Sequence, residues 1–431
     1  MKPFQIILIA VFGAMAIGGL IIFATFRGFS SQADPLNGGV TIWGTLDPQA
    51  FDQVISDIAS NNQKWGLVHY VRKDKETFSS ALVNGIAEGT GPDLVILPHE
   101  LLIAQASKLQ VIPYSTYSVR DFRSTFVEGS EIFLFPDGFY GLPFAVDPLV
   151  MYWNRNIFSS ARLAYPPRSW EELVRDTVPA ITRRTDSNDI TTATVAFGEY
   201  ANIQNAKAIL LMLMTQAGSK MVEIVNNTFQ VRLNVGAGTE VSTPADAAIR
   251  FFTQFANPSA VTYTWNRGQR NDREAFLAED LALYFGFGSE YQGLKDGNAN
   301  LNFDIAEVPQ GADETHKKGY GTLYALTIPK SAKNPAGAFE VAKQFSLTAT
   351  NDTLVRKLYL APARRDLINA KNGTAIGDTV YQSALITHGW LDPNPETSNT
   401  IFKEMIETIT SGRAKISESI ENASYQLQKA F

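Results

Sequence analysis

The chain has 431 residues, of which 45% are hydrophobic and 19% charged, a composition typical of a globular protein with a sizeable core and not of a disordered chain. Lys and Arg total 37 against 43 Asp and Glu, and with a net charge of −6 and no arginine-rich stripe the sequence predicts no nucleic-acid partner. Cysteine is absent, which excludes disulfides, thiolate zinc sites, cysteine nucleophiles and a lipid anchor on cysteine.

The first predicted element is a hydrophobic segment within residues 1–27, uncharged from Phe4 to Phe26. At about 1.5 Å per residue, a helix of this length spans the roughly 30 Å hydrocarbon core of a bilayer. We expect a transmembrane helix that anchors the chain to the cell membrane, followed by a linker over residues 28–39. Two alternatives stay open, a signal peptide cleaved near Ala33 before secretion and a buried helix of a soluble protein. An anchor or a signal places the remaining residues on the extracytoplasmic side.

Beyond the linker, strand-like and helix-like segments alternate. Short β-branched or apolar runs predict strands, and apolar residues at a spacing of three and four predict helices. The run that follows Asp93 is apolar throughout, which suits a strand buried on both faces of a parallel sheet. This alternation is typical of a doubly wound α/β layer. We predict strands at 40–43, 65–71 and 93–97 and helices at 51–58, 78–86 and 101–109.

A second α/β stretch covers residues 153–309. Ser169 is expected to cap a helix that begins near Trp170, because its hydroxyl can accept a backbone N–H of the first turn. The C-terminal residues repeat an amphipathic pattern that is interrupted near Gly412, which predicts a pair of packing helices. Further predictions are helices at 206–217 and 246–255 and a buried strand at 281–285.

The sequence carries no recognisable catalytic or metal-binding motif. Its four histidines are not spaced as ligands on one helix face, and neither a nucleophile elbow nor a phosphate-binding loop is present. We therefore predict a protein without cofactor or metal, and not an enzyme. A membrane-anchored glycoside hydrolase stays open as the enzymatic alternative, because its two carboxylates are recognised by their separation in space and not by sequence spacing.

Aromatic and polar residues gather in the loops that follow the predicted strands. Trp43 and Asp47 flank the loop after the first strand, Glu100 follows the third, and Tyr291 follows the strand at 281–285. In an open α/β sheet, ligands bind beyond the carboxyl ends of the strands. Rings cover the apolar face of a sugar and carboxylates bind its hydroxyls, so the pattern favours a neutral polyhydroxylated ligand. The alternative is that the following are ordinary core aromatics: Trp43, Tyr200, Trp265 and Tyr291.

Six motifs resemble, in matching order, those of the family 1 extracellular solute-binding proteins of ABC transporters, the group that includes maltose-binding protein. The resemblance extends from about residue 40 to the C-terminus. Each motif is short, but six in register over nearly the whole chain are hard to obtain by chance. They are residues 89–95 (GTGPDLV), 140–147 (YGLPFAVD), 151–154 (MYWN), 166–173 (PPRSWEEL), 275–283 (AFLAEDLAL) and 319–328 (GYGTLYALTI).

The resemblance implies an α/β, two-lobed periplasmic-binding-protein fold, type II-like, in which each lobe is a sheet flanked by helices. The ligand would bind in the cleft between the lobes, and closure around it is a hinge motion. The chain is expected to cross between the lobes near residues 144–147, 321–324 and 362–364. Lobe 1 then consists of residues 40–144 and 325–362, and lobe 2 of residues 147–321 and 364–431.

The resemblance also assigns candidate ligand contacts. Asp47 and Glu100 match acidic positions of the first lobe that contact sugar hydroxyls, and Asp147 matches a crossover acid with the same role. Glu199 and Tyr200 fall where a second-lobe acid and a stacking tyrosine lie.

The segment from Ser289 to Tyr291 occupies the place of a stacking tryptophan that this sequence lacks, so a ligand other than maltose is expected. Position at the predicted cleft adds further candidates to these assignments. They are Trp43, Trp265, Tyr324, Arg364 and Trp390.

The function that the resemblance implies is capture of a small ligand and its delivery to the subunits of an ABC permease. The expected ligand is a sugar or oligosaccharide, and the expected state is a monomer. A ligand sensor that signals to another membrane protein is the non-enzymatic alternative.

Overall fold

The computed structural model describes residues 35–233, 243–370 and 372–431. The hydrophobic segment predicted as anchor or signal, and most of the predicted linker, lie outside these residues. Of the helices within the described part of the chain, none is long and apolar enough to cross a membrane. The first described element is η1 (Pro35–Gly38), a short 3₁₀ helix beside the first strand.

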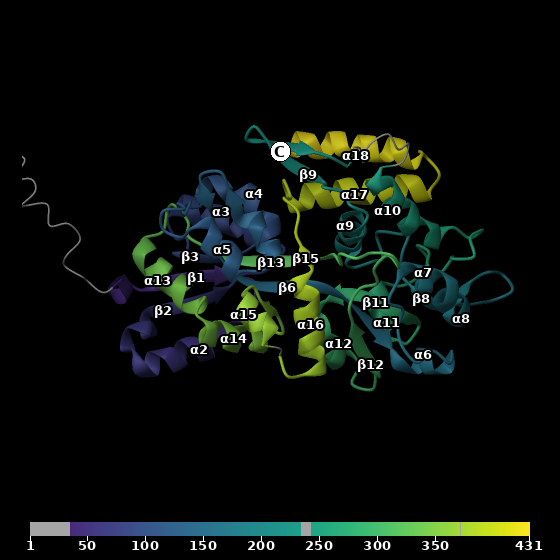
Figure 1. Cartoon of the computed structure of the whole chain (residues 1–431), viewed down its shortest axis with the longest axis horizontal. Helices are drawn as coiled ribbons and strands as arrows, with labels where there is room; N and C mark the ends of the chain where they lie inside the picture. The colour runs from purple at the N-terminus through teal and green to yellow at the C-terminus, as the bar shows by residue number, and fades with distance from the viewer. Residues whose placement is uncertain (1–34, 234–242, 371) are drawn as a thin grey trace, which may run out of the picture.

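The N-terminal half contains a parallel sheet in which the first strand lies between the second and the third. Both predicted helices that flank these strands are confirmed, because their apolar residues pack onto the sheet. Helices from residues 335–369, late in the sequence, cover the same half of the molecule (Figure 1). The elements are β1 (Val40–Gly44), α2 (Pro48–Asn61), β2 (Val68–Arg72), α3 (Phe78–Glu88), β3 (Leu94–Pro98), α5 (Val119–Thr125), α13 (Pro335–Phe345), α14 (Thr348–Lys357) and α15 (Arg365–Asn369).

Two predicted elements of this half are shorter than expected. The strand predicted at 65–71 begins only at Val68, because residues 63–67 form the 3₁₀ helix η2, started by the Asn62 side chain. The helix predicted at 101–109 is a single turn, α4 (Leu102–Gln105), between 3₁₀ turns. Here the chain leaves the helix because the carbonyl of Lys108 accepts the backbone N–H of Lys330, which ties it to the end of another strand.

One long strand connects the two halves. Every residue of β6 (Leu142–Asn154) is buried. Its first part pairs with β13 (Gly319–Thr327), and its second part pairs with β11 (Leu281–Phe287) and β12 (Phe303–Ala306). β13 and β6 approach so closely that a β-carbon at Gly321 would lie 2.5 Å from the carbonyl oxygen of Asp147. Eleven of the fifteen described strands therefore form one sheet that runs through both halves, and the other four form two separate two-stranded sheets.

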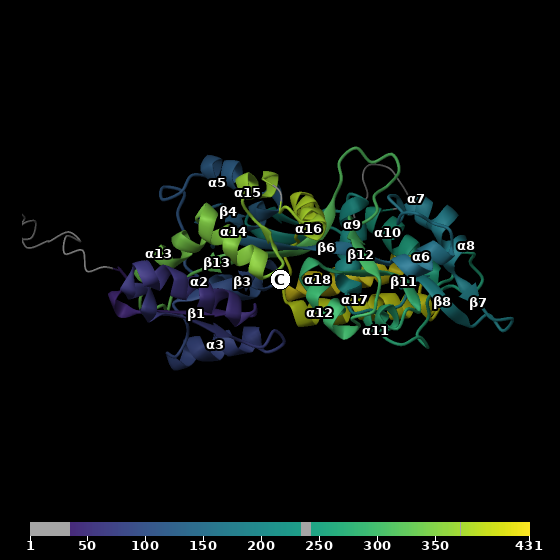
Figure 2. The same cartoon turned by 90° about the horizontal axis from the view of Figure 1, so that it is seen from below.

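The C-terminal half places most of its helices around β8 (Ile190–Val195) and β11 (Figure 2). The Ser169 cap is confirmed, since its hydroxyl accepts the backbone N–H of Glu172. The predicted C-terminal helices are also confirmed and pack against each other. The helices and small strands of this half are α6 (Arg155–Ser160), α7 (Trp170–Glu172), α8 (Val178–Ile181), β7 (Arg183–Arg184), α9 (Ala206–Gln216), β9 (Val222–Val225), β10 (Thr228–Val231), α10 (Pro244–Thr253), α11 (Asp272–Leu277), α12 (Tyr291–Gly297), α17 (Pro395–Thr410) and α18 (Ile416–Ala430).

Two short strands and a helix complete the junction between the halves. β14 (Ala361–Pro362) pairs with β6, and β15 (Thr387–His388) pairs with β13. Between them, α16 (Ala375–Leu385) packs across β6. The segments that contain β14 and β15 thus lie at the junction next to β6 and β13, where the fold can bend.

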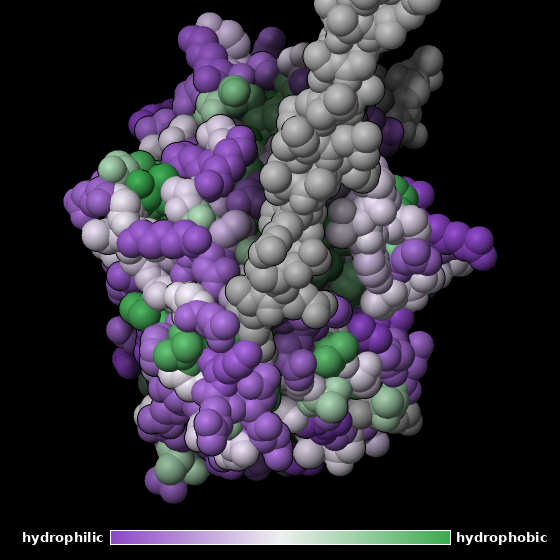
Figure 3. Space-filling model, turned by 90° about the vertical axis from the view of Figure 1, so that its left-hand side faces the viewer, coloured by the Kyte–Doolittle hydropathy of each residue, from purple (hydrophilic) through white to green (hydrophobic). Residues whose placement is uncertain are grey.

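Each half has its own aromatic cluster, and both clusters belong to one hydrophobic core that continues through the junction. Phe51 contacts Tyr70, Phe144 and Phe345 in the first half. In the second half, Phe197 lies at the centre of a larger cluster that includes Trp170. At the end of the molecule formed by the first half, the visible surface is mainly hydrophilic, with hydrophobic residues in small scattered groups (Figure 3).

Candidate functional site

A cavity of about 260 Å³ lies where the two halves meet. It is bordered by the loops that follow the carboxyl ends of β1 and β3, which is where open α/β sheets bind ligands. β13 supplies three polar side chains, and α9 and α17 form the opposite wall. The lining includes Thr45, Lys75, Phe78, Pro98, Glu100 and Leu101 from the first half, Tyr320, Thr322 and Tyr324 from β13, and Tyr200, Gln204, Asn205, Lys207, Phe287 and Asn399 from the second half.

Glu100 brings a negative charge to the cavity from the first half. The hydroxyl of Thr322 donates to Glu100 Oε1 at 2.7 Å, and His99 Nδ1 lies 3.2 Å from Oε2. Burial raises the pKa of the Glu100 carboxyl, but the adjacent His99 ring and the bond from Thr322 outweigh it and bring the pKa to about 2. Glu100 is therefore ionised at neutral pH, and a carboxylate with few bonds can accept hydroxyl donors from a ligand.

Tyrosines form much of the cavity surface. Tyr320 and Tyr324 extend from β13, and Tyr200 lies on the opposite side, where its hydroxyl donates to Asn399 Oδ1 at 2.7 Å. Burial raises the pKa of all three phenols, so each keeps its proton at neutral pH and can act as a donor. Their rings also give apolar area of the kind that covers the C–H face of a sugar.

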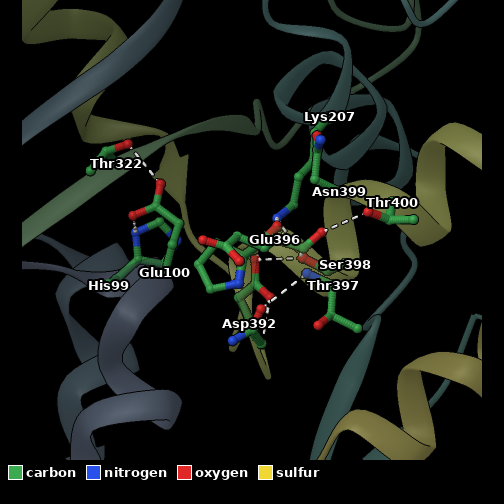
Figure 4. A network of polar contacts seen from close by, with 12 residues as sticks. His99, Glu100, Lys207, Thr322, Asp392, Glu396, Thr397, Ser398, Asn399 and Thr400 are labelled. Carbon is green, nitrogen blue, oxygen red and sulfur yellow. Dashed lines mark hydrogen bonds and ion pairs between the residues drawn. The ribbon is translucent and has the colours of Figure 1, made fainter. Parts of the chain in front are cut away.

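A lysine on α9 holds the wall of the second half in place. Lys207 Nζ donates to Asp392 Oδ2 at 2.5 Å, to Ser398 Oγ at 2.6 Å and to the carbonyl of Pro395 at 3.4 Å. Asp392 is fully buried and also accepts from the Ser398 hydroxyl. Figure 4 shows this group on the side opposite Glu100, His99 and Thr322. The ion pair therefore fixes the start of α17, and with it Asn399, against α9.

Asp147 and Ser289 join the crossing strand to the turn after β11. Asp147 lies in β6, and its carboxylate accepts the backbone N–H of Ser289 at 3.0 Å and the Ser289 hydroxyl at 2.5 Å. Burial raises the pKa of Asp147 to about 7, and Glu290 adds to this, while the Ser289 bonds and Lys75 oppose it. The contact ties η8 (Gly288–Glu290) to the junction, next to the cavity residue Phe287.

The other sequence candidates lie away from the cavity wall. Asp47 is exposed and caps α2 through Gln49, and Trp43 is buried beneath Lys73. Trp265 is fully buried and donates to Asn202.

Four more candidates have protein partners of their own. Glu199 pairs with Arg267, and Arg364 pairs with Asp366. Tyr291 contacts Phe303 and Tyr359, while Trp390 packs on Phe402. The structure thus gathers Glu100, Tyr200 and Tyr324 at the cavity and joins Asp147 to Ser289, and the remaining candidates stay predictions.

Several cavity residues were missing from the sequence candidates. Tyr320 and Thr322 share one face of β13 with Tyr324, because alternate residues of a strand point to the same side. Because Tyr324 was already a candidate, this alternation could have predicted Tyr320 and Thr322 as further cavity residues. Lys207 carried another signal, as it is the charged residue of an otherwise apolar stretch in α9. Asn399 gave none, since it comes from a helix 199 positions beyond its partner Tyr200.

A larger groove of about 800 Å³ lies in the second half, between the segment after α6 and the segment after β12. None of the sequence candidates lines it. Among residues 35–233, 243–370 and 372–431, no group of three or more His, Asp or Glu side chains is placed to hold a metal ion. The cavity between the halves is therefore the candidate site.

Asp272, at the start of α11, makes folding stability depend on pH. Burial raises its pKa to about 7, although it accepts the backbone N–H groups of Gln204 and Arg273. An unfolded aspartate titrates near about 3.9. Between these values the folded chain holds more protons than the unfolded chain, so stability falls as the pH rises from about 4 to about 7. We expect Asp272→Asn to lessen that fall by up to about 4 kcal/mol.

Urea unfolding at several pH values measures this effect. The exposed Asp313 provides the control, and Asp313→Asn should keep the dependence of the unaltered protein. Asp147 contributes a slope of the same sign, so some dependence remains in the Asp272 variant. Parallel profiles for Asp272→Asn and the unaltered protein would contradict the prediction.

Comparison with known proteins identifies the family. Residues 68–347 match the family of bacterial extracellular solute-binding proteins. The chain belongs to this family. Among curated relatives, a maltotriose-binding protein of Pyrococcus abyssi is 29% identical over 148 residues, 33% of this chain and 31% of the relative. A binding protein of Brucella abortus is 35% identical over 99 residues, 22% of this chain and 23% of the relative. These matches span a third or less of the relatives' length.

Solved structures of the same fold cover nearly the whole chain. A cyclo/maltodextrin-binding protein with maltotetraose has a TM-score of 0.72 at 14% identity, covering 93% of this chain and 98% of that one. The GacH receptor of Streptomyces glaucescens, also solved with acarbose, gives 0.69 at 17%, covering 91% and 98%. A Thermotoga lettingae solute-binding protein with α-D-tagatose gives 0.65 at 17%, covering 91% and 99%. At these identities the likeness shows the fold, and it confirms the predicted two-lobed periplasmic-binding-protein architecture.

Proposed function

We propose that this protein is an extracytoplasmic receptor that captures a carbohydrate between its lobes and delivers it to an ABC permease. The observation that carries the proposal is the cavity at the junction, to which both lobes contribute polar groups. Glu100 can accept sugar hydroxyls, Asn399 can donate and accept, and three tyrosines add apolar faces with hydroxyl groups. A hinge motion of the lobes would then enclose the sugar.

The names of related proteins support a sugar as the ligand class. The curated relative from Pyrococcus abyssi is named for maltotriose, and solved neighbours hold maltotetraose, acarbose or tagatose. The family consists of binding proteins, which does not favour the glycoside hydrolase alternative.

We also propose the lobe boundaries and the attachment predicted from the sequence. Lobe 1 is assigned residues 40–144 and 325–362, and lobe 2 residues 147–321 and 364–431. The passage of β6 and β13 through the junction supports the limits at 144–147 and 321–325, whereas α15 packs on α5 and lies with the first half. Residues 1–27 are proposed as the membrane anchor that holds the receptor near its permease. The receptor is proposed to act as a monomer.

Ligand binding by the purified full-length protein in detergent tests the proposal. Neutral mono- and oligosaccharides are screened by thermal unfolding, and a sugar at about 100 times its Kd should stabilise the fold by about 2.7 kcal/mol. Chromatography of the same mixtures should recover the sugar unchanged, because a receptor does not alter its ligand. A panel in which no sugar raises Tm, or in which sugars are hydrolysed, would refute the proposal.

A further inference from the structure

The size of the cavity limits how many sugar rings it can enclose. Its volume of about 260 Å³ lies below the range of about 300–1,000 Å³ that is usual for drug-sized ligands. This space suits one hexose ring and at most two.

Two tyrosine hydroxyls in the cavity lack a protein partner. Tyr320 is 3% exposed and Tyr324 is 7% exposed, and both line the cavity. Neither hydroxyl makes a hydrogen bond to another residue in the described part of the chain, whereas Tyr200 is already bonded to Asn399. Neither hydroxyl oxygen is a fully buried unpaired atom, so both reach the open space of the cavity and can hydrogen-bond a ligand there. Glu100 lies beside them and adds acceptor capacity.

The charges around the cavity disfavour an anionic ligand. No arginine lines it within the described residues, although guanidinium groups are the usual partners of carboxylates and phosphates. The ammonium of Lys207 already donates to three protein acceptors. Lys75 is exposed, while Glu100 places a negative charge on the inner wall. A carboxylate or phosphate on the ligand would therefore meet repulsion inside the cavity with a single exposed lysine to offset it.

The geometry points to a compact neutral polyol of one sugar ring, or at most two, as the ligand of this cavity. Hydroxyls of the ligand would pair with Tyr320, Tyr324 and Glu100. This inference rests on the proposed function and narrows it, because several structural neighbours are named with ligands of three or more sugar units, such as maltotriose and maltotetraose.

Calorimetry on the full-length protein in detergent tests ligand size and charge together. The probes are neutral monosaccharides and cyclitols, the corresponding di- and tetrasaccharides, and the uronate and 6-phosphate forms of the same sugars. We expect the tightest binding from a neutral probe of one or two rings, with the tetrasaccharide and the charged forms at least about tenfold weaker. Tightest binding of a tetrasaccharide or of an anionic form overturns the inference and leaves the receptor proposal standing. Absence of binding by every sugar overturns both.

Removal of single hydroxyls tests the contacts with the tightest neutral probe. Tyr320→Phe and Tyr324→Phe keep the ring and should each weaken binding about tenfold, because a ligand hydroxyl then loses its partner. Tyr117→Phe is the matched control, since its hydroxyl bonds Thr125 outside the cavity, and it should leave the affinity unchanged. Unchanged affinity in both cavity variants, with Tm of the free protein preserved, overturns the assignment of these contacts.

Discussion

Replacement of Asp392 by Ala is expected to destabilise the fold by about 3–5 kcal/mol. The carboxylate is fully buried, and its partner Lys207 is 17% exposed. The variant leaves an ammonium group without its counter-ion in a site of low polarity, and it also removes acceptors from Ser398 and from the backbone N–H of Asn394. The start of α17 would lose its main polar attachment to α9.

Urea unfolding measures the loss, and a double variant separates its causes. Lys207→Met together with Asp392→Leu removes both charges and fills similar volume, so it should recover much of the lost stability. Asp176→Ala is the control, because its pair with Arg175 is exposed and exposed pairs contribute about 0–1 kcal/mol. A loss below about 1 kcal/mol for Asp392→Ala would show that the buried pair does not hold α17.

Local sequence patterns predicted the elements whose apolar residues face a single core. The helices α2, α3 and α9 and the strands β1, β3 and β11 all begin within a few residues of their predicted limits. The errors at 65–67 and 106–109 arose where contacts with distant residues override local preference. The carbonyl of Lys108, for example, accepts an N–H from Lys330, more than two hundred residues later.

The candidate site was predictable to a smaller extent, because its wall is assembled from segments far apart in the sequence. Glu100 was recognised from its place after a buried strand, and Tyr324 from its place in the crossing strand. Lys207 was missed although it is the charged residue of an otherwise apolar stretch in α9. Trp43 lies at a strand end, the position of a ligand contact, and packs beneath Lys73, so its contact with a ligand stays a prediction.

Replacement of Asp147 by Ala is expected to weaken sugar binding by about 2 kcal/mol, or roughly thirtyfold. The carboxylate is 5% exposed and accepts both the N–H and the hydroxyl of Ser289. Without it, the N–H and the hydroxyl of Ser289 lose their acceptor, and the turn that carries Phe287 to the cavity is no longer tied to β6. Calorimetry with the tightest sugar of the panel measures the change. Unchanged affinity would remove Asp147 from the site.

The Asn variant distinguishes the charge of Asp147 from its shape. Asn keeps an oxygen that can accept the Ser289 N–H, but it cannot carry a negative charge. Because burial raises the pKa of Asp147 to about 7, the unaltered carboxyl is mostly protonated at pH 5.5 and mostly ionised at pH 8.5. We therefore expect Asp147→Asn and the unaltered protein to bind the sugar alike at the lower pH and to differ at the higher one. An equal difference at both pH values would mean that the hydrogen-bond geometry, and not the charge, sets the contribution of Asp147.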